Sequence, residues 1–134
     1  GFRNAEDFIK YSVVGFSGVL VNLGLYTILT RYFDFSEVIA ALISIEIALL
    51  SNFLLNNFWT FRKREISRSI YKRFLQFHIV SGGGACLNYF TFLFAFAFLG
   101  LHDILSNLIG IAVAAILNYL INSNWTWRKE HGSN

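Results

Sequence analysis

The chain has 134 residues, of which 55% are apolar and 18% aromatic, while only 14% are charged. An ordinary soluble domain carries about 25% charged residues, and a small one keeps a large share of its surface in water. The composition therefore excludes a water-soluble globular domain and predicts a protein whose apolar surface faces lipid.

Four apolar runs follow one another along the chain, separated by an acidic break at 34–37, a basic connector at 62–73 and a short break at 102–103. A bilayer span needs about 20 apolar residues, and it must be helical so that its backbone groups are satisfied internally. We expect helices at about 9–33, 38–60, 74–101 and 104–127. The fold class predicted is an all-α membrane protein with four transmembrane helices, forming one domain over residues 1–134.

Basic residues indicate the orientation. Of the 11 Lys and Arg residues, all except Arg31 lie in the N-terminal segment, the connector or the C-terminal tail. Four spans bring these three segments to one side of the membrane, and the positive-inside rule makes that side cytoplasmic. We therefore expect a multi-pass protein of the cytoplasmic membrane with both termini cytoplasmic.

The sequence repeats with a shift of 66 positions, from about 8–64 to about 74–130. Gly18 matches Gly84, and Trp59 matches Trp125, so the register holds through two helices and the loop between them. Each repeat is a helical hairpin, and repeats with an even number of spans are parallel in the membrane. The sequence therefore predicts a pseudo-two-fold four-helix bundle.

Three asparagines inside the spans of the first repeat recur at matching positions in the second: Asn22, Asn52, Asn56, Asn88, Asn118 and Asn122. An amide in hydrocarbon is costly unless it is paired, so these side chains are expected to face the bundle interior. They would serve either as interhelical hydrogen bonders or as a polar niche for a sugar or phosphate head group. Residue spacing alone does not choose between these roles.

Glu46 lies near the middle of the second span, where its repeat mate is Ala112. An ionisable residue at this depth is a functional candidate, either as a proton-coupling group or as part of the head-group niche. The alternative is a neutral acid that donates a hydrogen bond to a neighbouring amide.

An aromatic belt and a basic flank end each repeat, and their residues are Trp59, Arg62, Lys63, Trp125, Arg128 and Lys129. This order is typical of a helix that leaves the bilayer on its cytoplasmic side. These residues are candidates for binding a phosphate or lipid head group. The alternative is that they serve only as a topology signal.

Other polar patterns do not favour catalysis. Gly82, Gly83 and Gly84 lack the lysine of a phosphate loop and are expected to permit close helix packing, and Cys86 is expected to be a small core residue. No Ser-His-Asp pattern, carboxylate pair or metal-ligand spacing is present in the sequence. We expect no catalysis by this chain alone, no cofactor, no metal and no nucleic-acid partner.

The repeat ends and the early pattern from Val13 to Asn22 resemble the GtrA-like family over residues 8–129. This resemblance implies a four-helix membrane protein of cell-surface polysaccharide synthesis, which binds polyprenyl-phosphate-linked sugar and acts as a flippase for it. Similar domains follow glycosyltransferases that resemble dolichol-phosphate mannose synthases. There they anchor the enzyme and orient its lipid acceptor.

Two hypotheses therefore stand: a carrier of lipid-linked sugar, and the membrane anchor of a glycosyltransferase that acts in cis or in trans. The missing initiator Met favours the second, whereas the length favours the first. A four-helix proton-coupled exporter is disfavoured because its acid would lie in the first helix. The oligomeric state is left open, with a homodimer as one option.

Overall fold

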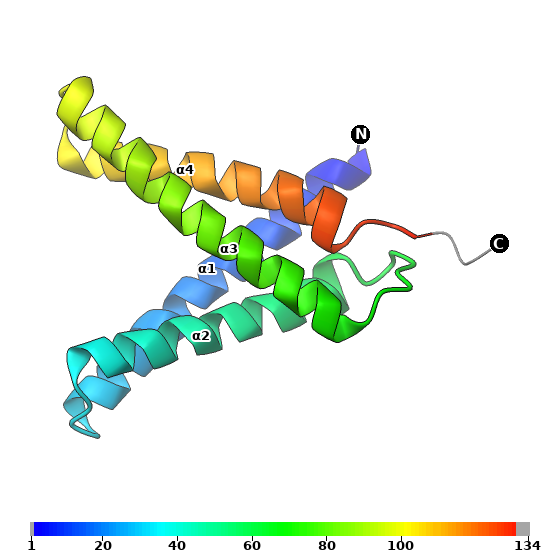
Figure 1. Ribbon diagram of the computed structural model, residues 1–134, viewed down its shortest axis with the longest axis horizontal. Coiled ribbons are helices and arrows are strands. Elements are labelled where there is room, and N and C mark those ends of the chain that lie inside the picture. The colour runs from blue at the N-terminus through cyan, green and yellow to red at the C-terminus, as the bar shows by residue number, and fades with distance from the viewer. Residues whose placement is uncertain (1, 131–134) are drawn as a thin grey trace. The chain divides into compact units, whose positions relative to one another are not determined.

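The computed structural model describes residues 2–130, with side chains from Ala5 onward, and within that range it contains helices and no strand. The chain divides into two units, Gly1–Lys63 and Arg64–Asn134. Unit 1 is a hairpin of α1 (Phe2–Arg31) and α2 (Glu37–Leu55), and unit 2 is a hairpin of α3 (Ile70–Leu93) and α4 (Asp103–Ile121) (Figure 1).

Three of the four helices continue into a π-helical turn. These turns are η1 (Asn56–Thr60) after α2, η2 (Phe94–Phe98) after α3 and η3 (Asn122–Thr126) after α4. The four continuous helical stretches are Ala5–Arg31, Glu37–Thr60, Ile70–Phe98 and Asp103–Thr126, each long and apolar enough to cross a membrane. The prediction of four membrane-spanning helices is therefore confirmed. The chain is a multi-pass membrane protein.

Local signals in the sequence account for the helix starts. Ser36 and Ser69 cap α2 and α3 by accepting hydrogen bonds from the backbone N–H groups of Ile39 and Lys72. Since Ser69 supplies this cap, α3 begins at Ile70, ahead of the start near 74 that apolarity alone suggested. The basic connector is correspondingly shorter than expected.

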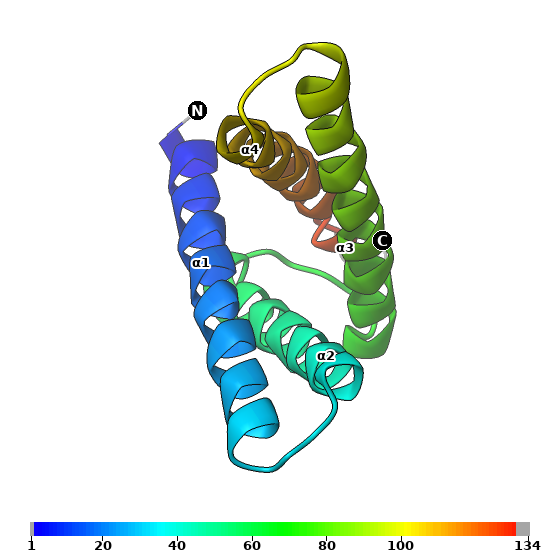
Figure 2. The ribbon, with the colours of Figure 1, turned by 90° about the vertical axis from the view of Figure 1, so that its left-hand side faces the viewer.

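The hairpin loops of the two units share an unusual backbone conformation. Asp34 has φ 58° and Gly100 has φ 68°, and the two residues are separated by the repeat shift of 66. The left-handed region suits glycine and is tolerated by aspartate. In Figure 2 the two chain reversals, between α1 and α2 and between α3 and α4, face the viewer.

Small residues at every fourth position form the core between the helices of each hairpin. In unit 1 the small or polar buried positions at this spacing are Ala40, Ser44 and Ala48 of α2 and Asn56 and Thr60 of η1. In unit 2 the positions at this spacing are Ser106, Gly110, Ala114, Asn122 and Thr126, and the larger Phe53 and Tyr119 are also buried at matching places in the two units. Small side chains let helix backbones approach closely. In lipid no hydrophobic effect drives helices together, so this close van der Waals packing stabilises their association. The same positions are buried in both units, and the pseudo-two-fold arrangement of the units stays a prediction.

Candidate functional site

Amide side chains lie over glycines inside each hairpin. Asn52 on α2 packs against Gly18 on α1, at a point where a Cβ on Gly18 would overlap the Asn52 carboxamide. Asn118 on α4 packs against Gly84 on α3 in the same way. Each unit therefore contains an equivalent asparagine–glycine contact between its two helices.

The amides that precede the belts are used within their own helices. Thr60 donates its hydroxyl hydrogen bond to Asn56 Oδ1 at 2.8 Å, and Thr126 donates to Asn122 Oδ1 at 2.6 Å. The Phe61 N–H bonds to Asn56 O, and the Trp127 N–H to Asn122 O, each at 2.8 Å, which closes the wider π-helical ring. Asn56 and Asn122 therefore shape the turns that place the aromatic belts.

Asn22 and Asn88 lie farther along α1 and α3, and both are partly exposed. Asn88 lies against Gly110 of α4, where a Cβ would come within 2.7 Å of the Asn88 carbonyl oxygen. Asn52, Asn88 and Asn118 therefore lie at the helix–helix contact of their own hairpin, and Asn56 and Asn122 are buried. Unit 1 retains unused polar capacity there, since Ser44 Oγ and Asn52 Oδ1 are buried without a hydrogen-bond partner among the described residues.

Glu46 lies on α2 away from the buried stripe. Its side chain is exposed, as is that of its repeat mate Ala112, while Ser44 and Ala48 on the adjoining face are buried. The structure therefore does not bring Glu46 into the amide row that packs α1 against α2.

The aromatic belts have the same environment in both units. Trp59 and Trp125 are each 39% exposed, whereas Phe61 and Trp127 are buried. The Phe61 ring lies 6.3 Å from Tyr11, and the Trp127 ring lies 5.6 Å from Phe77. One aromatic residue thus anchors each turn in the hairpin, and the other remains available to an interfacial ligand.

Lys10 adds a cation to the belt of unit 1. Its ammonium lies 5.4 Å from the centre of the Trp59 ring and 3.1 Å from a Glu6 carboxylate oxygen. Sequence reasoning did not single out Lys10. The signal was available, because Lys10, Val14 and Gly18 recur every four residues and therefore share the face of α1 that meets α2.

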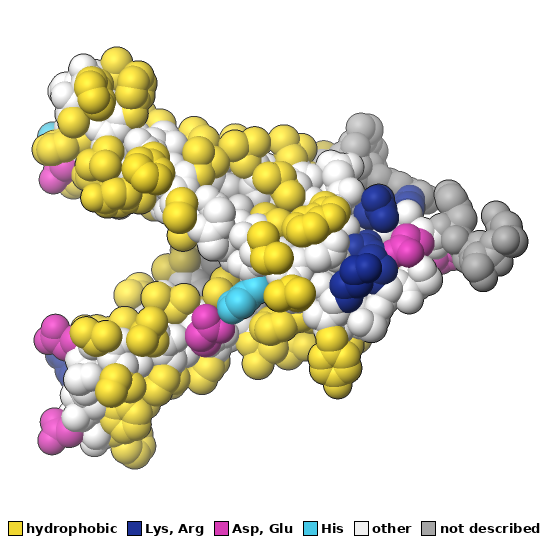
Figure 3. Space-filling model, viewed as in Figure 1, with side chains coloured by type: hydrophobic (Ala, Val, Ile, Leu, Met, Phe, Trp, Pro, Cys, Tyr) yellow, Lys and Arg dark blue, Asp and Glu magenta, His cyan; other side chains and the backbone are white. Residues whose placement is uncertain are grey.

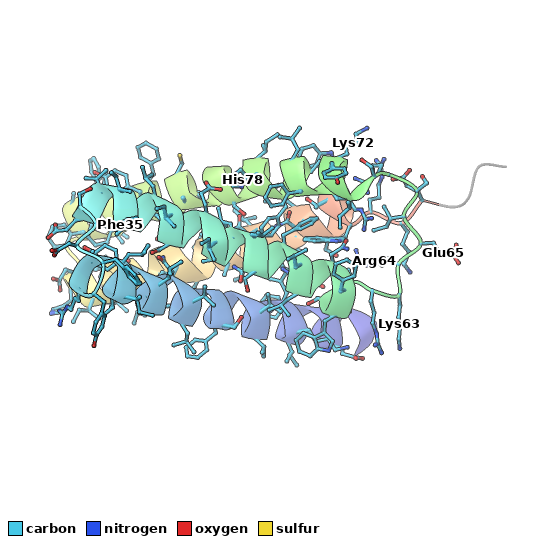
Figure 4. All side chains as sticks on the ribbon, turned by 90° about the horizontal axis from the view of Figure 1, so that it is seen from below. Phe35, Lys63, Arg64, Glu65, Lys72 and His78 are labelled. Atoms are coloured by element: carbon cyan, nitrogen blue, oxygen red, sulfur yellow. The ribbon has the colours of Figure 1, made fainter. Side chains whose placement is uncertain are left out.

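The basic clusters contain two kinds of cation. Arg62 and Lys63 after η1, and Arg128 and Lys129 after η3, are exposed. In unit 1, Lys63 lies at the end opposite the hairpin loop that carries Phe35, and in unit 2, Arg64 and Lys72 lie on the connector side (Figure 4). Figure 3 shows basic side chains gathered near the start of α3 and acidic side chains at the hairpin tips.

Arg64 and Arg68 instead hold η3 and the two residues that follow it. Arg64 donates to Ser123 Oγ at 2.9 Å and to the carbonyl oxygen of Trp127 at 3.0 Å. Arg68 donates to the carbonyl oxygens of Trp125 at 2.9 Å and Arg128 at 3.0 Å. Carbonyl groups at a helix end lack intrahelical partners, so these arginines satisfy and stabilise that end.

Glu130 completes this connection between the connector and the tail. Its carboxylate accepts hydrogen bonds from the Ser67 hydroxyl and from Arg68 Nε, and its backbone N–H bonds to Glu65 O at 2.8 Å. The Ser67 and Arg68 hydrogen bonds lower the pKa of Glu130 below its ordinary value. We call Glu65, Ser67, Arg68 and Glu130 the tail clamp.

The chemistry available at these ends is electrostatic. The exposed cations and the half-exposed Trp of each unit suit a phosphate at the membrane interface, because Lys and Arg bind anionic head groups there. Among residues 2–130, no group of three or more His, Cys, Asp or Glu side chains is placed to hold a metal ion.

Comparison with known proteins adds two findings. Residues 10–127 match the family model described as GtrA/DPMS, transmembrane domain. The chain is also 38% identical over 123 residues to a dolichol-phosphate mannosyltransferase from Pyrococcus furiosus, an alignment that covers 91% of this chain and 34% of that protein. The chain thus spans about a third of the length of this relative.

Proposed function

The chain belongs to the GtrA/DPMS transmembrane-domain family, and on this premise we propose that it binds polyprenyl-phosphate-linked sugar in the cytoplasmic membrane. One observation carries the proposal. In both units a half-exposed Trp lies within a π-helical turn, and two exposed cations follow that turn. The phosphate would lie beside Arg62 and Lys63, or beside Arg128 and Lys129. The polyprenyl chain would extend along the apolar helices.

The finer role that we favour is to anchor a glycosyltransferase, in cis or in trans, and to present its lipid. The relative is named as a dolichol-phosphate mannosyltransferase, and this chain corresponds to about a third of it. On this proposal the basic ends are cytoplasmic, and the catalytic groups belong to the partner enzyme or domain.

Movement of the lipid-linked sugar across the membrane is a second candidate. One observation favours it: the amide row continues from Asn56 to Asn22 in unit 1 and from Asn122 to Asn88 in unit 2, so polar groups reach well into the span. In this role Glu46 would exchange a proton. Glu46→Gln should then fold normally and lose transport in proteoliposomes, and full transport by the variant would exclude Glu46 from the mechanism.

The proposal is tested by measuring the Kd of a short polyprenyl phosphate, with and without mannose, in nanodiscs of neutral phosphatidylcholine. Arg62→Gln/Lys63→Gln and Arg128→Gln/Lys129→Gln remove the exposed cations. Each cation near the surface contributes about 1 kcal/mol, so each double variant, which removes two cations, should weaken binding at its own helix end about thirtyfold.

Arg31→Gln, at the opposite end of α1, is the matched control and should leave the Kd unchanged. Arg64 and Arg68 are not substituted because they hold η3 and the two residues that follow it. Equal affinity of the charge variants and the wild type would contradict the proposal.

A further inference from the structure

Two cations lie near the start of α3, a place in a helix that favours acidic residues. Lys72 and Arg73 are the third and fourth residues of α3, and its first turn contains no acid. By contrast, α2 and α4 begin with Glu37 and Asp103. The start of a helix carries the positive end of its dipole, so cations there are unfavourable and anions are favourable. An anion bound at the start of α3 would offset this cost.

Arg68 joins the start of α3 to the end of η3. Its guanidinium donates to Gln76 Oε1 on α3 and, at 2.9 Å, to the carbonyl oxygen of Trp125. Gln76 follows Arg73 by three positions and Lys72 by four, so these three side chains share one face of α3. The two cations therefore lie on the face of α3 that meets the aromatic belt of unit 2.

This place contains more positive than negative charge. Glu130 interacts electrostatically with three arginines, Arg68, Arg73 and Arg128. Its carboxylate accepts a hydrogen bond from Arg68 Nε, which pairs it with that arginine. One carboxylate cannot neutralise three guanidinium groups, and like charges held close together repel one another. A second anion would relieve this repulsion.

The matching place in unit 1 differs in charge. The repeat shift of 66 puts Glu6 and Asp7 where unit 2 has its two cations. Residues 3–10 carry two basic and two acidic side chains, whereas the matching residues 69–76 carry two basic side chains and no acid. The residues that follow the two belts are Arg-Lys in both units, so the difference lies at the starts of α1 and α3.

We propose that the tight site for the lipid phosphate is this end of unit 2, formed by Lys72, Arg73, Arg128 and Lys129, and that it selects a phosphate monoester. This inference rests on the proposed function. A polyprenyl phosphate carries close to two negative charges above its second pKa of about 6, whereas the sugar-bearing lipid is a phosphodiester with a single charge. Excess positive charge favours the dianion. The lipid without sugar, which is the acceptor in glycosyl transfer, is therefore the favoured ligand, and the end of unit 1 is the weaker site.

The first test compares two lipids of equal length and different charge. The protein in nanodiscs of neutral phosphatidylcholine at pH 8 is titrated with a short polyprenyl phosphate and with its methyl phosphodiester, and each isotherm is fitted to a tight and a weak site. The tight site should bind the monoester about tenfold more tightly than the diester, the effect of one ligand charge. Equal affinities would overturn the selection of the monoester.

Exchanging the charges between the helix starts identifies the unit. Lys72→Glu/Arg73→Asp installs the residues of unit 1 and should weaken the tight site by at least about thirtyfold, the effect of losing two surface cations. The reciprocal Glu6→Lys/Asp7→Arg should strengthen the weak site. Unchanged isotherms of both variants would overturn the inference.

A milder variant keeps the test decisive if the double exchange unfolds the protein. Lys72 is exposed, and the cap contact with Ser69 uses only its backbone N–H, so Lys72→Gln should fold (Figure 4). It should bind the monoester about fivefold more weakly. Arg31→Gln removes an exposed cation at the far end of α1 and is the matched control. An effect of Lys72→Gln no larger than that of Arg31→Gln would contradict the proposed site.

Competition identifies the source of the phosphate. Unlabelled polyprenyl phosphate should displace the bound monoester, whereas inorganic phosphate or phosphatidylglycerol at the same concentration should not. Displacement by inorganic phosphate would assign the cluster to a soluble phosphate, and displacement by phosphatidylglycerol would assign it to anionic lipid in general, so either result would overturn the inference. If Arg128→Gln/Lys129→Gln weakens binding but the exchanges at the helix starts do not, this inference fails while the proposed function stands.

Discussion

Gly18 and Gly84 show how single residues set the packing of each hairpin. A methyl group at either position would overlap the Asn52 or Asn118 carboxamide, whereas a methyl group at Gly15 or Gly83 would meet nothing within 4 Å. The sequence presents all four as glycines in apolar helices. Only the neighbours across the hairpin distinguish them.

Gly18→Ala should therefore lower the free energy of unfolding by about 1–3 kcal/mol, the usual cost of overpacking. Gly15→Ala is the matched control, and it should be neutral or stabilising because alanine favours a helix by about 1 kcal/mol over glycine. Unfolding in mixed detergent micelles measures both. Equal effects of the two substitutions would contradict the prediction, because they would mean that the Asn52 side chain moves away from the added methyl group at no cost.

At the scale of the element, the π-helical turns η1 and η3 depend on one side-chain hydrogen bond each. Thr60→Val removes the donor to Asn56 Oδ1 and leaves a buried oxygen unpaired, which should cost about 1–3 kcal/mol. Asn56→Leu/Thr60→Val removes both partners and should cost less than the sum of the single changes. A double-mutant cycle on unfolding free energies gives the coupling, and strictly additive effects would contradict this role.

The tail clamp predicts a dependence on pH. Because hydrogen bonds from Ser67 and Arg68 lower the pKa of Glu130, the clamp is stabilised above the ordinary carboxyl pKa. This stabilisation is lost as the pH falls through the lowered pKa of the folded protein. Hydrogen exchange of the Glu130 N–H, which bonds to Glu65 O, should therefore remain protected at neutral pH and accelerate in acid relative to the intrinsic rate.

Glu130→Gln supplies the control for the clamp. The amide cannot ionise, so its protection should be weaker at neutral pH and should change little as the pH falls. A protection profile identical to that of the wild type would show that the backbone bond to Glu65 holds the tail without the carboxylate.

At the scale of the whole molecule, the sequence was sufficient for the four spans. Apolar runs bounded by the acidic break, the basic connector and His102-Asp103 predicted the helices, because span length and loop polarity are local properties. The resemblance to the GtrA-like family is confirmed by the family match over residues 10–127.

The sequence was less informative about the candidate site. It presented Arg64 only as part of the basic connector at 62–73, since a run of basic residues does not reveal which of them bonds to Ser123 and Trp127 about 60 positions away. It did not reveal the π-helical turns, because the Asn–Thr pairs in them are four positions apart, the same spacing as in an ordinary α-helix. The roles of the six asparagines, Glu46 and the belt residues as a binding site stay predictions.

Orientation is the next prediction at this scale. Phe33→Cys and Leu99→Cys at the hairpin tips, and Glu65→Cys in the connector, are exposed positions suited to labelling in a Cys86→Ser background. An impermeant thiol reagent added to intact cells should label the tips and spare the connector, because the basic ends are predicted to be cytoplasmic. Labelling of Glu65→Cys alone would contradict the predicted orientation and indicate the opposite one.

The most direct measurement of the central claim is photo-crosslinking of a polyprenyl phosphate that carries a diazirine beside its phosphate, followed by peptide mapping. If the basic ends bind the head group, crosslinks should concentrate in residues 59–63 and 125–129 and should decrease when unlabelled polyprenyl phosphate competes. They should persist when phosphatidylglycerol is added at the same concentration. Crosslinks spread evenly along the four helices, or lost equally to phosphatidylglycerol, would contradict a polyprenyl-phosphate site at these ends.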